Sequence, residues 1–178
     1  MNSKIFLTLI NIVVLVFVAF ILYRLCMVDY GTVISGDLWT AKRYGSKYIV
    51  SIKNHADFND AVTDFVKKEN IKVGYISGVG SAGSVTLRFY DASGKKHIDK
   101  TFNEQVEISN LIGNISTDDT SPYFHLHIVC GRKDYSTISG HFVNAKVNGS
   151  TELWVEDIPT AKTPRKYDQE TGLRIFDF

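Results

Sequence analysis

The sequence predicts an α+β domain with a mostly antiparallel β-sheet and one main helix, preceded by a single N-terminal transmembrane helix. Three observations predict this fold class. An uncharged apolar run occupies residues 5–22, apolar residues recur three and four positions apart from Phe58 to Val66, and short or alternating apolar runs follow from Val73 onward. Many strands after one helix, without regular alternation, indicate an antiparallel sheet.

The first predicted element, residues 5–22, is expected to anchor the chain in a membrane. Eighteen helical residues span about 27 Å, close to the thickness of a bilayer's hydrocarbon core. A cleaved secretory signal and a helix outside the membrane are the alternatives, but bulky residues follow the run where a cleavage site needs small ones. The expected organisation is an anchor over 1–27, a linker over 28–36 and a domain over 37–178. We expect a single-pass membrane protein with this domain outside the cytoplasm.

Two strands and a helix open the predicted domain. Residues 47–53 are rich in β-formers, and residues 39–44 are their expected hairpin partner across Gly45-Ser46. Asp57 can cap a helix whose apolar stripe faces the core and which ends near Lys67-Lys68. The remaining predicted strands are 73–77, 84–90, 97–102, 106–109, 111–115, 123–130, 137–143 and 152–156, followed by a polar tail and residues 173–178.

Charge and cysteine content exclude some classes of protein. The chain has 20 Lys and Arg against 19 Asp and Glu, so no strong positive field attracts it to phosphates. Nucleic acid is therefore not an expected partner. Cys26 and Cys130 do not form a disulfide framework.

The glycine-rich run Gly78 to Gly83 matches the G-x-G-x-x-G pattern of dinucleotide-binding loops. That pattern requires a following helix, whose N-terminus holds the pyrophosphate, whereas residues 84–90 resemble a strand. We therefore interpret the glycines as a tight or close-packed strand connection and expect no nucleotide cofactor.

Three histidines form the strongest predicted site. His125 and His127 are two apart on a strand, so both imidazoles point to one face. If the next hairpin is centred on Asp134, His127 lies opposite His141. Three imidazoles with one open position suit a divalent metal, zinc being the commonest, whereas polar residues on an exposed sheet face are the alternative. Cys130 should point to the opposite face and is expected to be a buried structural residue.

The same segments resemble the PPC (plants and prokaryotes conserved) domain family, bacterial type, over about residues 36–178. The resemblance rests on residues 74–81, 108–116, the His125-Leu126-His127 and Ser139-Gly140-His141 block, and residues 168–173. It implies a compact α+β domain, a homotrimer and a metal site on the three histidines. Bacterial members are often labelled as DNA-binding proteins. The chain departs from the family in having no AT-hook, Ser139 in place of a glycine, and the N-terminal apolar run.

The sequence therefore predicts a membrane-anchored, oligomeric binding or interaction module that can hold zinc or another divalent metal on His125, His127 and His141. One alternative is a zinc-dependent enzyme acting on a small carbonyl or carboxylate compound, because the PPC fold is similar to that of acetolactate decarboxylase. Glu104, Glu107, Glu152 and Arg88 could then supply an acid, base or charge. DNA binding, as the family label implies, is the second alternative. The catalytic residues and the small ligand are not predicted.

Overall fold

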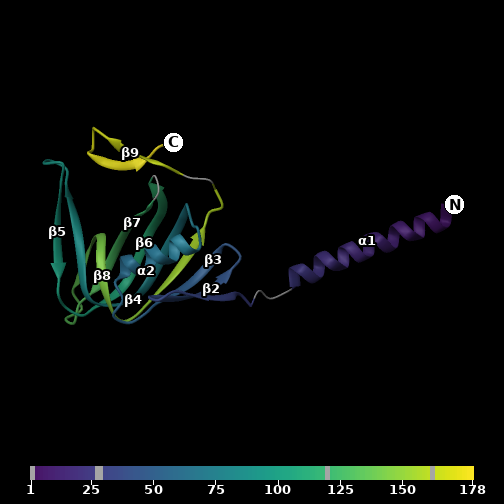
Figure 1. Ribbon diagram of the computed structural model, residues 1–178, viewed down its shortest axis with the longest axis horizontal. Helices are drawn as coiled ribbons and strands as arrows, with labels where there is room; N and C mark the ends of the chain where they lie inside the picture. The colour runs from purple at the N-terminus through teal and green to yellow at the C-terminus, as the bar shows by residue number, and fades with distance from the viewer. Residues whose placement is uncertain (1–2, 27–29, 119–120, 161–162) are drawn as a thin grey trace. The chain divides into compact units, whose positions relative to one another are not determined.

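The computed structural model describes residues 3–26, 30–118, 121–160 and 163–178 of the chain (Figure 1). The chain divides into two compact units, Met1–Tyr30 and Gly31–Phe178. The first unit contains helix α1 (Ser3–Cys26), and the second contains all the strands and helix α2 (Phe58–Lys68).

Helix α1 corrects the prediction of a membrane anchor. Within the described residues, no helix has both the length and the apolar character needed to cross a membrane. The expected transmembrane helix over residues 5–22 and the single-pass membrane localisation with an extracytoplasmic domain are therefore wrong.

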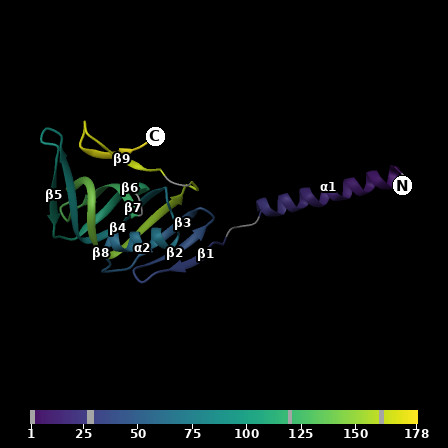
Figure 2. The same ribbon diagram turned by 45° about the horizontal axis from the view of Figure 1, so that its top comes forward.

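The second unit is built on one eight-stranded antiparallel sheet (Figures 1 and 2). Its spatial order is β1-β2-β3-β8-β7-β6-β4-β5, with a further pairing between β8 and β4. The strands are β1 (Thr32–Ser35), β2 (Trp39–Tyr44), β3 (Lys47–Ile52), β4 (Gly74–Asp91), β5 (Lys96–Phe102), β6 (Val106–Asp118), β7 (Ser121–Gly131) and β8 (Thr137–Asp157). Strand β1 lies within the segment predicted to be a linker.

Strands β4 and β8 are longer than predicted, and each replaces two expected strands. They pair with each other from Gly74 opposite Asp157 to Arg88 opposite His141, with register shifts on the way. The glycine-rich run is part of β4, and a Cβ atom on Gly78 would lie 2.6 Å from the carbonyl oxygen of Glu152. The run is thus a close-packed stretch of strand, because only glycine lets the two backbones approach this closely.

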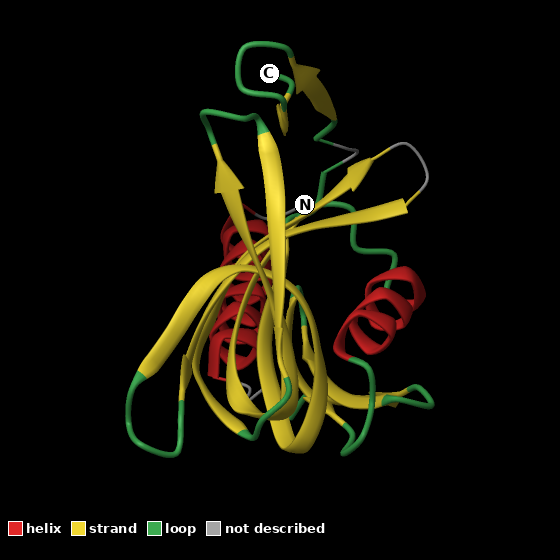
Figure 3. Cartoon of the chain, turned by 90° about the vertical axis from the view of Figure 1, so that its left-hand side faces the viewer, coloured by secondary structure: helices red, strands yellow, loops and turns green. Residues whose placement is uncertain are grey.

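Helix α2 covers one face of the sheet, as its apolar stripe predicted (Figure 3). The Asp57 side chain accepts a hydrogen bond of 3.2 Å from the Asp60 amide, which confirms the predicted N-cap. Five side chains of α2 are buried: Phe58, Ala61, Val62, Phe65 and Val66. Phe65 packs edge-on against Trp39 and Tyr48, with ring centroids 5.1 and 5.3 Å away, so the helix is fixed on β2 and β3.

A second, small sheet pairs β9 (Arg165–Asp168), which lies in the predicted polar tail, with β10 (Leu173–Phe176), which lies in the segment after it. Arg165 is buried and donates hydrogen bonds to Ser116 Oγ at 2.9 Å and Asn114 Oδ1 at 2.7 Å. Its guanidinium also lies over the rings of Tyr123 and Phe176. These contacts hold the C-terminal hairpin against β6 and β7, close to the histidines.

Candidate metal centre

A tight turn sets the register of the strands that carry the histidines. Between β7 and β8, the Arg132 amide donates to the Ser136 carbonyl at 2.8 Å, and Asp134 Oδ1 accepts from the amide and hydroxyl of Ser136. This turn places His127 directly opposite His141. The register inferred from the sequence is therefore confirmed.

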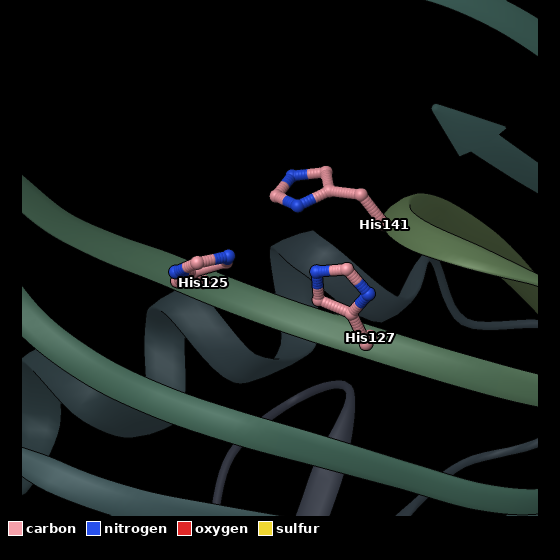
Figure 4. A group of neighbouring side chains, drawn as sticks. All are labelled: His125, His127 and His141. Carbon is pink, nitrogen blue, oxygen red and sulfur yellow. The ribbon is translucent and has the colours of Figure 1, made fainter. Parts of the chain in front are cut away.

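The three imidazoles meet at one point of the sheet surface (Figure 4). His125 and His127 extend from the same face of β7, and His141 extends towards them from β8. Ring centroids are 5.5 Å apart for His125 and His127, and 5.4 Å apart for both pairs that include His141. One nitrogen from each ring lies within 4.8 Å of the other two.

This geometry fits a divalent metal with little adjustment. Zinc–nitrogen bonds of about 2.0–2.1 Å at tetrahedral angles place ligand nitrogens roughly 3.3 Å apart. The histidine nitrogens need to approach one another by at most about 1.5 Å, which small side-chain rotations can supply. Three ligands leave at least one coordination position for another molecule.

The environment of His125 and His141 keeps both rings uncharged, as metal ligands must be. Burial, together with the nearby charges of His125, His127 and Arg88, lowers the pKa of His141 to about 4. Burial also lowers the pKa of His125, with additional effects from His127 and Arg165. Both rings are therefore neutral at pH 7 and have a free lone pair for a cation.

A cavity opens beside the histidines where β7 and β8 separate. Their pairing ends at His127 and His141. Residues of β7 before His127 pair with β6 alone, whereas β8 continues against β4. The cavity has a volume of about 240 Å³. Its wall includes Tyr123 of β7, His141 of β8, Arg88 of β4 and Asn59 of α2.

Of the four residues considered as acids, bases or charges, Arg88 lies at this site. It is directly opposite His141 on one side and Asp99 on the other. Glu104 instead forms a bidentate ion pair with Arg132. Glu107 lies opposite Gly131, and Glu152 lies opposite Ser51, so neither faces the histidine pair across a neighbouring strand.

Other expectations about side chains near the site can also be compared with the structure. Cys130 is fully buried in the core on the other face of β7, as predicted, and burial raises the pKa of its thiol to about 11. Asp99 and Asn59 were not identified from the sequence. The hairpin between residues 84–90 and 97–102 could have indicated Asp99, because its register places Asp99 opposite Arg88. The sequence contains no comparable signal for Asn59, which comes from a helix.

Comparison with known proteins places the domain among proteins of the same fold. Residues 40–159 match the profile of the Plants and Prokaryotes Conserved (PCC) domain. A solved "putative dna binding protein" from Bacteroides thetaiotaomicron is 46% identical, with a TM-score of 0.76, and the match covers 80% of this chain and 99% of that chain. No curated protein matches the chain.

Two more distant structures share the fold. A metal-containing protein from Archaeoglobus fulgidus is 24% identical with a TM-score of 0.70, and the match covers 85% of this chain and 99% of that one. A plant- and prokaryote-conserved (PPC) protein from Pyrococcus horikoshii is 22% identical with a TM-score of 0.70, and the match covers 82% of this chain and 98% of that chain.

Proposed function

Because the chain belongs to the Plants and Prokaryotes Conserved domain family, we propose that its domain is a binding module that holds one divalent metal ion on His125, His127 and His141. The observation that carries this proposal is the convergence of three ligand nitrogens within 4.8 Å. A set of three imidazole ligands favours zinc among the common divalent ions. A relative of the same fold is described as metal-containing, which supports the proposal.

The surroundings of the site favour binding over catalysis. A bound divalent ion would supply a positive point for an anionic or carbonyl group. The carboxylate of Asp99 lies in the same row of the sheet as His141 and is paired with Arg88. That pairing lowers the pKa of Asp99, which makes this carboxylate a weak base.

The metal content of the purified full-length chain tests this function. We expect about one zinc ion per chain after expression with added zinc and purification without chelators. A His125→Ala/His127→Ala variant should lose it. The matched control is a His55→Asn/His97→Gln variant, which removes the other two histidines and should keep the metal. Asparagine suits position 55 because that residue has a φ of 64°. Metal-free wild-type protein, or metal retained by the double alanine variant, would contradict the proposal.

DNA binding is a second proposal, and its support is the description of the 46%-identical relative. A chain with 20 basic and 19 acidic residues should bind duplex DNA weakly and with a shallow dependence on salt. Fluorescence anisotropy with a labelled duplex at 50 and 200 mM salt measures this. No binding at the lower salt concentration would remove the proposal.

We also propose that the domain forms a homotrimer, as the family resemblance implies, through the exposed apolar part of the sheet. Five neighbouring side chains form this apolar patch, each 41–48% exposed: Ile49, Tyr75, Val79, Ile112 and Trp154. A groove of about 370 Å³ beside Tyr75 and Trp154 could receive side chains of a second copy. Sedimentation velocity should show a trimer for the wild type and a monomer for Ile112→Glu/Trp154→Glu. Phe89→Glu, which changes an exposed apolar residue elsewhere, should stay trimeric.

A further inference from the structure

We propose that the cavity beside the histidines binds a small carboxylate, held by the guanidinium of Arg88. This inference rests on the proposed metal site and names the class of ligand that would occupy its open side. It concerns a site that lies next to the histidines and whose walls come from β4, β7, β8 and α2.

The sheet places Arg88 beside the histidines. Residues that oppose each other in an antiparallel sheet share a face, and Arg88 lies opposite His141, which in turn lies opposite His127. The three side chains therefore form one row across three neighbouring strands. Arg88 is also part of the cavity wall, and its side chain is only one-third exposed.

Asp99 orients Arg88 without using all of its donors. Arg88 Nε donates to Asp99 Oδ1 at 2.6 Å, and Nη2 donates to Oδ2 at 2.7 Å. In the described part of the chain, Nη1 has no hydrogen-bond partner. A guanidinium fixed along one edge by a carboxylate can bind a second carboxylate with its remaining N–H groups.

The rest of the cavity selects for a small ligand with an apolar portion. A volume of about 240 Å³ is below the usual range of drug-sized ligand pockets, so it suits a molecule of a few heavy atoms. Pro122, Phe124 and Phe142 supply apolar wall. Tyr123 also lines the cavity.

Charge balance favours an anion. The three histidines are neutral ligands, so a divalent ion on them would leave two uncompensated positive charges. Asp99 compensates the charge of Arg88 alone. A carboxylate between Arg88 and the open side of the histidine cluster would be attracted by both.

The ion pair of Arg132 with Glu104 is bidentate like that of Arg88 with Asp99, but it lies away from the cavity. Arg132 binds Glu104 through Nε and Nη2, at 3.2 and 2.8 Å, with a similarly exposed side chain. It lines none of the described cavities and lies at the far end of β7 from His125. Arg132→Gln is therefore the matched control for Arg88→Gln.

The test uses the full-length chain loaded with cobalt(II), whose visible absorption reports on its ligands. Acetate is titrated at constant ionic strength, with acetamide as a neutral probe of the same shape, and cobalt content is measured in each sample. We expect acetate to change the spectrum of the wild type and of Arg132→Gln with equal affinity. Affinity should fall by at least tenfold in Arg88→Gln, the loss of one charge-assisted hydrogen bond, while cobalt stays bound. Acetamide should have no effect below tenfold higher concentrations.

The outcomes separate the two proposals. Equal acetate affinity in the wild type and Arg88→Gln, with cobalt bound in both, overturns the carboxylate site and leaves the metal site standing. A wild type that binds no cobalt overturns the metal site and the carboxylate site together. If Arg88→Gln fails to hold cobalt, Arg88→Lys is the deciding variant. It keeps the positive charge but loses the paired N–H groups, so acetate affinity should fall at least threefold, and unchanged affinity overturns the proposal.

Discussion

The approach of β6 to β7 at Gly113 predicts that a single methyl group will disrupt the histidine cluster. Gly113 lies opposite Leu126, between the two histidines of β7. A Cβ atom at Gly113 would overlap the carbonyl oxygen of His125 and would lie 2.9 Å from both the His125 carbonyl carbon and the Leu126 Cα. The obstacle is backbone, so no side-chain rotation relieves it.

The expected effect of Gly113→Ala follows from this overlap. Ordinary contacts of a Cβ begin near 3.4 Å, so β7 must move away by at least about 0.5 Å, and overpacking of this kind typically costs about 1–3 kcal/mol. For a chain of this size that corresponds to a fall in Tm of roughly 2–12 °C. Because His125 moves with its backbone, zinc affinity should fall by at least tenfold.

Gly131→Ala is the matched control, since it makes the same change at the other end of β7. There the nearest atoms to the added Cβ are Ser109 Oγ at 3.7 Å and the Glu107 carbonyl oxygen at 3.9 Å. Thermal unfolding of the chelator-treated proteins and zinc titration with a competing dye measure both effects. If Gly113→Ala has the Tm and zinc affinity of Gly131→Ala, the reasoning from backbone approach is refuted.

Three further predictions concern the surroundings of the site. Arg165→Lys should lower the free energy of unfolding by about 1–3 kcal/mol, because it loses charge-assisted hydrogen bonds and ring stacking. Backbone amides of β9 and β10 should then exchange faster with deuterium, while those of β3 should not. Equally faster exchange in all three strands would contradict the anchoring role of Arg165. Cys130, whose thiol pKa burial raises to about 11, should resist iodoacetamide at pH 8 in the native protein and react in urea, as peptide mass spectrometry can show. The folded-state pKa of His141 is lowered from 6.5 to about 4, so the folded chain binds fewer protons than the unfolded chain between these values. The contribution of His141 to the stability of the metal-free protein should therefore be constant above pH 6.5 and fall as the pH drops towards 4, by less than about 1.4 kcal/mol per unit because the ring is partly exposed. Urea unfolding at several pH values should show a flatter profile for His141→Gln, and identical profiles would exclude this residue.

The convergence of the histidines could be predicted because it depends on local geometry. A period of two fixes the face shared by His125 and His127, and a turn centred on Asp134 fixes the partner of His127. Both rules act over short stretches of the chain. The helix over residues 58–68 was predictable for the same reason, since its cap and apolar stripe lie within one segment.

Features that depend on distant strands could not be predicted in this way. The glycines at 78–83 interrupt the apolar pattern, so β4 was expected to be two strands. Its continuity depends on the close approach of β8, which lies far along the chain. Hydropathy alone also gave the wrong function for residues 5–22, because an apolar composition predicts a helix without deciding what surrounds it.

The long pairing of β4 with β8 connects the fold to the proposed chemistry. At Gly74 to Gly80, β4 pairs with the end of β8; from Ala82 to Arg88, it pairs with the beginning of the same strand. Strand β8 ends its pairing with β7 at His141 and continues along β4, and the cavity lies where β7 and β8 separate. The pairing with β4 places Arg88 in the row of His127 and His141. The histidine cluster depends on the pairing of β7 with β8, whereas the position of Arg88 depends on the pairing of β4 with β8. Ligand binding should therefore be more sensitive than metal binding to changes in β4.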